Sequence, residues 1–215
     1  MTATANRPRA LAVRAGGRRG ALELRAAGGD GTMPTLTGRF AIFNAPTEID
    51  SLWEGHFIER IAPGAFNATL AEDRSAIRCL FQHGMDPHAG DKPLGPIRTL
   101  REDAIGAFYE VPLLDAGYVH ELIPGLEAGV YGASFCFRAT AEAWDEAPGP
   151  SAGNPTGLPE RVLRAVELVE FGPVTFPAYD GATAGLRARQ LVRTIERRLD
   201  GREHVPARPD QPAAA

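Results

Sequence analysis

The order of apolar and polar residues predicts a chain built mainly of strands. Apolar or alternating runs bounded by Gly, Pro, Asn and Asp are typical of strands, and they occur at 36–43, 56–61, 76–82, 94–100, 105–113, 130–139 and 162–176. A turn at Glu102-Asp103 separates two of these runs and predicts a hairpin. The pattern favours the α+β class, with a mostly antiparallel, closed β-barrel of about seven short strands and a few helices packed outside it.

Helical spacing is confined to three segments. A short helix is expected at 66–70. Apolar residues recur at i, i+3, i+4 and i+7 over 119–126, where Asp115 is the expected N-cap and Pro124 ends or kinks the helix. A further apolar stripe runs through 185–200 on a segment rich in Arg.

The two ends of the chain differ in composition from its centre. Residues 1–34 are rich in Ala, Gly and Arg without a sustained period, which predicts a disordered arm. The predicted strands place one globular domain at 35–186, followed by a basic amphipathic helix at 187–203 and a disordered tail at 204–215. The Arg-rich start also fits an organelle transit peptide, but its Pro and Gly residues disfavour the amphipathic helix that such a peptide forms.

Composition and charge exclude several classes of protein. Hydrophobic residues make up 44% and charged residues 23% of the 215, which is typical of a globular domain. No run of 18 apolar residues predicts a membrane span, and the start lacks the apolar region of a secretory signal. Two cysteines make no disulfide framework and favour a reducing compartment. The net charge is −4 although both ends are basic, so the acidic body is a poor platform for nucleic acid.

One serine stands out because it lies inside a predicted strand. The chain has four serines, and the other three fall in predicted turns or helix ends. Strand alternation places Ala133, Phe135 and Phe137 on the core face, and Ser134 with Cys136 on the other, less bulky face. A hydroxyl there could meet an extended peptide, although the pattern alone fits a solvent-facing serine better.

A nucleophilic serine needs a base, and the base needs an orienting partner. His83 ends the predicted strand 77–83 and is the candidate base. Glu170 is the candidate partner, because Val166, Leu168 and Glu170 share a face of their predicted strand. Glu167 on the opposite face, and the loop residues Asp86 and Asp91, remain alternatives.

Two other chemistries compete with this interpretation. The segment from His83 to Asp91 also contains His88 and Asp86, and such a set could bind a metal, although its spacing matches no strong metal motif. Cys136 could act as a cysteine nucleophile, although the phenylalanines on both sides favour a space-filling role.

Six segments spread over residues 36–187 share their order with a known family. They are Gly38–Asn44, Phe57–Phe66, Cys79–His83, 93–108, Gly132–Phe137 and 168–179. The second segment, FIERIAPGAF, is similar to the run E-x-I-x-P-G-A-F, and the fifth is similar to G-x-S-x-G-F. In these features the chain resembles the prohead proteases, the capsid-maturation serine proteases of tailed phages, which are related in fold to the herpesvirus assembly proteases. It departs from them at Cys136, where Gly is common, and at Phe171-Gly172, which replaces Val-Ser.

The resemblance implies a serine endopeptidase with Ser134 as nucleophile and His83 as base, without a metal or cofactor. The herpesvirus relatives have a late-strand His as third member, and Glu170 is the substitute here because that region has no His. The implied substrate is a scaffold protein, the scaffold-like arm of the major capsid protein, or the chain itself. The implied place is the immature capsid in the host cytoplasm. A homodimer is also implied, and neither specific nucleic-acid binding nor a membrane partner is expected.

Two alternatives from other classes stay open. The first is a catalytically inactive structural or scaffold module of the same fold, which would have no reason to keep both Ser134 and His83. The second is a cysteine hydrolase that uses Cys136.

Overall fold

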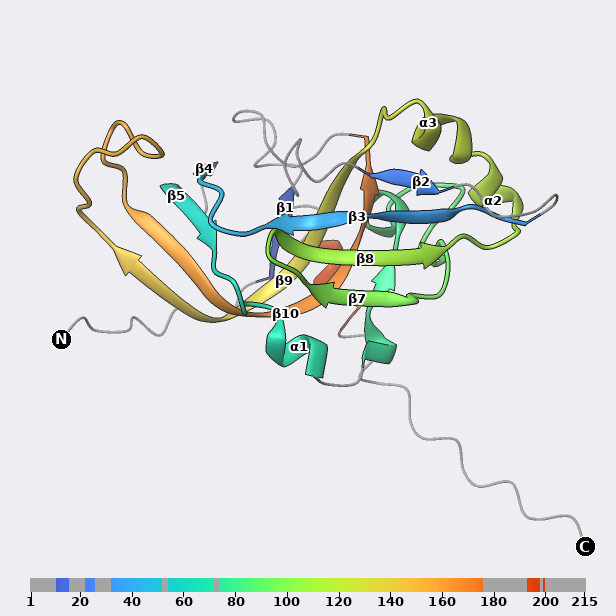
Figure 1. Ribbon diagram of the computed structural model, residues 1–215, viewed down its shortest axis with the longest axis horizontal. Coiled ribbons are helices and arrows are strands. Elements are labelled where there is room, and N and C mark those ends of the chain that lie inside the picture. Colours follow the sequence, from blue (N-terminus) through green and yellow to red (C-terminus); the bar gives the residue numbers. More distant parts are fainter. Residues whose placement is uncertain are drawn as a thin grey trace, which may run out of the picture.

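The computed structural model describes residues 11–15, 22–25, 32–51, 54–71, 74–175, 193–197 and 199. Its main elements are two β-sheets that share one hydrophobic core (Figure 1). The first sheet contains β1 (Leu11–Ala15), β9 (Gly132–Asp145), β10 (Glu160–Val174), β5 (Gly55–Ile61) and β4 (Thr47–Ser51) in this order, and β6 (Arg78–Cys79) pairs with β10. The second contains β2 (Glu23–Arg25), β3 (Thr35–Ile42), β8 (Gly106–Pro112) and β7 (Thr99–Glu102).

The helices are short and lie between strands. They are α1 (Asn67–Ala71), α2 (Gly117–His120), α3 (Ile123–Glu127) and the 3₁₀ turns η1 (Arg74–Ala76) and η2 (Phe81–Gly84). The fold is therefore mostly β with a few short helices, as predicted, and most strand pairs are antiparallel. β5 and β6 run parallel to β10, which makes the first sheet mixed. Closure of the sheets into a barrel stays a prediction.

Two long strands form the middle of the first sheet. β9 has 14 residues and β10 has 15, and they pair from Gly132 opposite Val174 to Asp145 opposite Glu160. β9 is longer than the strand expected at 130–139, whereas β10 has the expected length but begins two residues earlier. Beyond Ala139, β9 carries exposed or partly exposed residues of mixed polar and apolar character. The apolar pattern of this strand therefore ends before its hydrogen-bonded pairing with β10 does.

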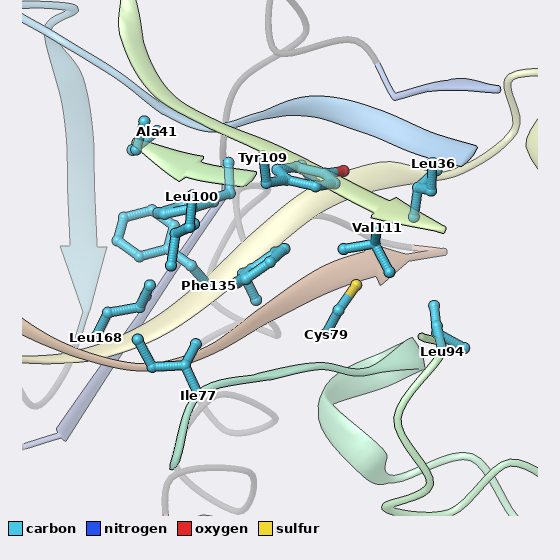
Figure 2. Packing of buried hydrophobic residues seen from close by; sticks show 14 of the residues in the cluster. Leu36, Ala41, Ile77, Cys79, Leu94, Leu100, Tyr109, Val111, Phe135 and Leu168 are labelled. Atoms are coloured by element: carbon cyan, nitrogen blue, oxygen red, sulfur yellow. The ribbon is translucent and has the colours of Figure 1, made fainter. Parts of the chain in front are cut away.

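The core lies between the two sheets. The Phe40 ring of β3 lies 5.3 Å from Phe66, 5.3 Å from Phe135 and 5.0 Å from Phe171, measured between ring centroids. Figure 2 shows side chains of β8, among them Tyr109, on the far side of this core from Phe135 of β9. The face of β9 that the sequence assigns to the core is confirmed, because Ala133, Phe135 and Phe137 are all buried there.

Several predicted elements are confirmed and others are wrong in detail. The strands expected at 36–43 and 56–61 are β3 and β5, the helix expected at 66–70 is α1, and the hairpin is β7–β8. Asp115 is not the N-cap of α2, because Ala116 takes that position and the Asp115 carboxylate contacts His120 at 2.7 Å instead. The helix expected over 119–126 is interrupted between α2 and α3, just before Pro124, and Pro124 itself lies in the first turn of α3, where a missing N–H costs nothing.

The predicted disordered arm contains two strands, β1 and β2, so the prediction of disorder is wrong for these segments. Leu11 and Val13 of β1 pack with Cys136 and Ile195, and this tertiary contact outweighs the polar composition of the arm. Residues 193–197 and 199 are helical, as expected for the basic helix, while the rest of 187–203 and the tail 204–215 lie outside the described residues. No helix in the described ranges is long and apolar enough to cross a membrane.

Candidate active site

Ser134 lies on β9 directly opposite Gly172 of β10, and Cys136 lies opposite Glu170. Directly opposed residues of two strands point to the same face of a sheet. Ser134 and Glu170 therefore share a face, two residue steps apart along the paired strands. Ser134 is fully buried, so the alternative of a solvent-facing serine is wrong.

His83 lies in a tight turn and not at the end of a strand. β6 ends at Cys79, and Phe81–Gly84 forms a 3₁₀ turn, so the prediction that His83 continues the strand is wrong. Gln82 and His83 have φ values of 50° and 56°, in the left-handed region that non-glycine residues rarely adopt. Such a conformation costs about 1–3 kcal/mol per residue and persists where the surrounding structure requires it.

The turn brings the His83 ring onto Glu170. Nδ1 of His83 lies 2.6 Å from Oε1 of Glu170, and the two side chains are only 7% and 5% exposed. A carboxylate oxygen accepts, so the proton lies on Nδ1 and Nε2 of the neutral ring is left with a lone pair. The other oxygen of Glu170, Oε2, is buried without a hydrogen-bond partner among the described residues. The carboxylate is thus placed to stabilise positive charge that develops on the ring.

A β-bulge decides the orientation of Glu170. The register between β10 and β9 shifts between Leu168 and Glu170, so Leu168 opposes Phe137 and Glu170 opposes Cys136. Leu168 therefore points into the core, while Glu170 points to the opposite face with Ser134. The prediction that Val166, Leu168 and Glu170 share one face is wrong, because it assumes unbroken alternation.

The other acidic candidates are not brought to His83. The side chain of Glu167 is 51% exposed and pairs with Arg138 at 3.3 Å. Asp86 accepts the backbone N–H groups of His88 and Ala89 at 2.9 and 2.8 Å and so closes its own loop. Asp91 is exposed. Within the described residues, no group of three or more His, Cys, Asp or Glu could hold a metal ion.

Cys136 is fully buried beside Glu170. Burial raises the pKa of the Cys136 thiol well above its ordinary value, and the negative charge of Glu170 raises it further. A thiolate is the nucleophilic form of cysteine, so this environment disfavours a cysteine nucleophile.

Gly172 allows the His83 turn to approach the sheet. A Cβ atom at this position would lie 1.9 Å from the carbonyl oxygen of Leu80, which no real contact tolerates. The Leu80 N–H donates to the Phe171 carbonyl at 2.9 Å, so the approach is a backbone pairing. Glycine is required here because two backbones meet face to face.

Ser134 makes its hydrogen bond to β1 and not to His83. The Ser134 hydroxyl donates to the carbonyl oxygen of Arg14 at 2.9 Å, and Ala15 lies directly opposite Ser134. β1 is not among the predicted strands, although Leu11 and Val13 alternate with Ala12 and Arg14, which is a short strand signal. The structure therefore brings His83 and Glu170 into contact, and it places Ser134 on the face that carries Glu170, beside β1.

Residues 20–197 match the family described as Caudovirus prohead serine protease. One solved structure is similar, the bacteriophage T4 capsid assembly protease, gp21, with a TM-score of 0.46 and 12% identity over 78% of this chain and 98% of that one. The comparison with curated proteins gives no match.

Proposed function

Since the chain belongs to the Caudovirus prohead serine protease family, we propose that it is the endopeptidase that cleaves a scaffold protein, or the scaffold-like arm of the major capsid protein, and also itself. The observation that supports this function best is the buried contact between His83 and Glu170 on the face that carries Ser134. A dyad of this kind serves a hydroxyl nucleophile, and the sequence places one serine on that face.

The proposed reaction has two halves. Nε2 of His83 takes the proton of Ser134 as Oγ bonds to the peptide carbonyl carbon, and Glu170 stabilises the charged ring. The protonated ring then gives its proton to the departing amine as the C–N bond breaks, which leaves an ester on Ser134. Water, deprotonated by His83, hydrolyses the ester, and the proton returns to Oγ. In this structure the Ser134 hydroxyl donates to the Arg14 carbonyl, so it must give up this hydrogen bond before it can bond to His83.

The negative oxygen of the intermediate requires N–H donors. We place this oxyanion hole at the amides near Phe171 and Gly172, because Gly172 lies directly opposite Ser134. The reaction as written needs no metal or cofactor.

The proposal extends to where the enzyme acts. The substrate is carried inside the immature capsid in the host cytoplasm, and cleavage takes place there. The two sheets, which share one core, are proposed to close into a barrel like that of the herpesvirus assembly proteases. A homodimer stays a prediction.

The test is cleavage of the capsid protein of the same phage by the full chain, followed by intact mass. The variants are Ser134→Ala and, as the matched control, Ser151→Ala in the exposed loop that precedes β10. We expect the wild type and the control to trim the capsid arm or themselves, and Ser134→Ala to leave every chain whole. If Ser134→Ala cleaves as the wild type does, Ser134 is not the nucleophile. If no chain is trimmed while all remain folded, the inactive structural module is the better description.

A further inference from the structure

β1 lies along the edge of the strand that carries Ser134 (Figure 1). It pairs antiparallel with β9 over its whole length, from Leu11 opposite Arg138 to Ala15 opposite Ser134. Addition of an extended segment to a strand edge is a common mode of peptide recognition. β1 therefore has the place and the hydrogen-bonding pattern that an extended substrate would take on this edge.

The register of β1 singles out one peptide bond. The carbonyl oxygen that accepts the hydrogen bond of the Ser134 hydroxyl, at 2.9 Å, belongs to Arg14, so the peptide bond between Arg14 and Ala15 lies next to the candidate nucleophile. Arg14 is the residue on the N-terminal side of that bond. The residues around the Arg14 side chain would therefore select the substrate residue on the N-terminal side of the cleaved bond.

The surroundings of the Arg14 side chain form a built site. The residue is 3% exposed, and Glu59 is 2% exposed. All five guanidinium N–H groups have an acceptor: Nε and Nη2 donate to Glu59 at 2.6 and 3.1 Å, Nη1 and Nη2 to Glu54 at 3.1 and 2.7 Å, and Nη1 to the Val13 carbonyl at 3.0 Å. The Phe137 ring lies 5.8 Å from the guanidinium carbon. Two forked carboxylates match a planar guanidinium and no other side chain.

The charge of this site requires a cation. Glu54, Glu59 and Glu142 face Arg14 and Arg161. Without Arg14, three carboxylates would share one guanidinium in a largely buried place. Glu59 is buried, so loss of Arg14 would leave excess negative charge at a buried position, and a replacement for β1 that supplies a positive charge is favoured.

We infer that β1 is an internal stand-in for the substrate: it blocks Ser134 until it is displaced, and the pocket of Glu54 and Glu59 selects substrates with arginine on the N-terminal side of the cleaved bond. This inference rests on the proposed function, because it assigns a regulation and a substrate class to the same serine.

The first experiment tests the pocket. The full chain is given two quenched fluorescent peptides with the sequence of residues 9–17, RALAVRAGG, one with arginine and one with citrulline at the position of Arg14. Citrulline keeps the shape and loses the charge. We expect kcat/KM to be about 100-fold higher for the arginine peptide, as the loss of one partner of a buried ion pair implies. Glu59→Gln should reduce this preference at least to about 10-fold, while Glu167→Gln, on an exposed pair, should keep it.

The second experiment tests the block. Arg14→Gln in the full chain removes the anchor of β1, and we expect it to lower KM for the arginine peptide about tenfold or more, since an internal competitor is weakened. Arg25→Gln, which removes a 60% exposed guanidinium from β2, is the matched control and should leave KM unchanged. Because Arg14→Gln could unfold the chain, hydrogen exchange of the Ser134→Ala variant, which keeps Arg14, provides an independent measure. An excess of arginine peptide should speed exchange at residues 11–15 in the Ser134→Ala variant, and the citrulline peptide should not.

The outcomes separate this inference from the proposed function. If the wild type cleaves the capsid protein but treats arginine and citrulline alike, the pocket does not select substrates and the inference is wrong, while the proposed function stands. Unchanged exchange at residues 11–15 with saturating arginine peptide would show that β1 is a permanent edge strand. If Ser134→Ala cleaves the capsid protein as the wild type does, both fail.

Discussion

Glu170→Gln is the substitution that tests the candidate site most directly. It replaces the carboxylate that contacts Nδ1 of His83 at 2.6 Å by an amide of the same shape. The amide carries no charge, and it can present its NH₂ group to the ring and so favour the wrong tautomer. Ser134 would then lose a base with the correct tautomer, although the fold around it stays the same.

The size of the effect follows from the burial of the pair. Both side chains are at most 7% exposed, so water screens their interaction little. Two unit charges about 4 Å apart interact by about 4 kcal/mol at an effective dielectric constant of 20. Since about 1.4 kcal/mol is a factor of ten in rate, loss of the stabilised imidazolium should lower kcat/KM roughly 1000-fold.

The matched control is Glu167→Gln. Glu167 lies on the same strand but is 51% exposed and pairs with Arg138, so its removal should change kcat/KM less than about twofold. The assay is cleavage of the capsid protein followed by intact mass, with the thermal midpoint of each variant measured alongside. If Glu170→Gln keeps more than a tenth of the wild-type activity, or if Glu167→Gln falls as far, Glu170 does not orient His83.

Three further predictions concern packing, pH and thiols. Gly172→Ala should lower the free energy of unfolding by about 3 kcal/mol or more in urea titrations, since its Cβ has no room, whereas Gly149→Ala, with nothing within 4 Å, should be near neutral. Hydrogen bonds from Arg39 lower the pKa of Asp103 to about 2 from 3.8. The contribution of the Asp103 carboxylate to folding stability is therefore complete above about pH 4 and is lost as the pH falls toward 2. In urea titrations from pH 2 to 5, Asp103→Asn should remove this part of the pH dependence of the free energy of unfolding. Iodoacetamide should leave Cys136 of the folded protein unmodified and its activity intact, and inactivation that follows labelling of Cys136 would revive the cysteine hydrolase.

The sequence predicts the candidate residues but not the way in which they meet. Ser134 could be assigned to its face of β9 because that strand alternates regularly between Ala133 and Phe137. His83 and Glu170 were each placed by the same rule, and the rule does not hold at either. The strand before His83 ends at Cys79, and a bulge precedes Glu170. Both irregularities lie where β10 pairs with β9 and β6, which are distant in the chain, and a local pattern does not contain such pairing.

β1 is a strand that local sequence patterns did not predict. Its five residues lie in an arm rich in Ala, Gly and Arg, and local composition there predicts disorder. Leu11 and Val13 are buried because β9 and Ile195 cover them, and Arg14 is buried because Glu54 and Glu59 pair with it. All of these partners are at least 40 residues away in the chain, so no local signal reports them.

What the sequence by itself determined is the mostly β fold class, the core face of β9, the hairpin, and the serine, histidine and glutamate of the candidate site. The fold class, the core face and the hairpin depend on alternation and turn residues, which are properties of short stretches of chain. The three candidate residues depend also on the order of segments that the chain shares with the family. The tertiary structure alone decided that His83 and Glu170 touch, that Gly172 lets the turn approach, and that β1 pairs with the strand that carries Ser134. These contacts join segments far apart in the chain, and their free energy comes from burial and pairing that exist only once the sheets have formed.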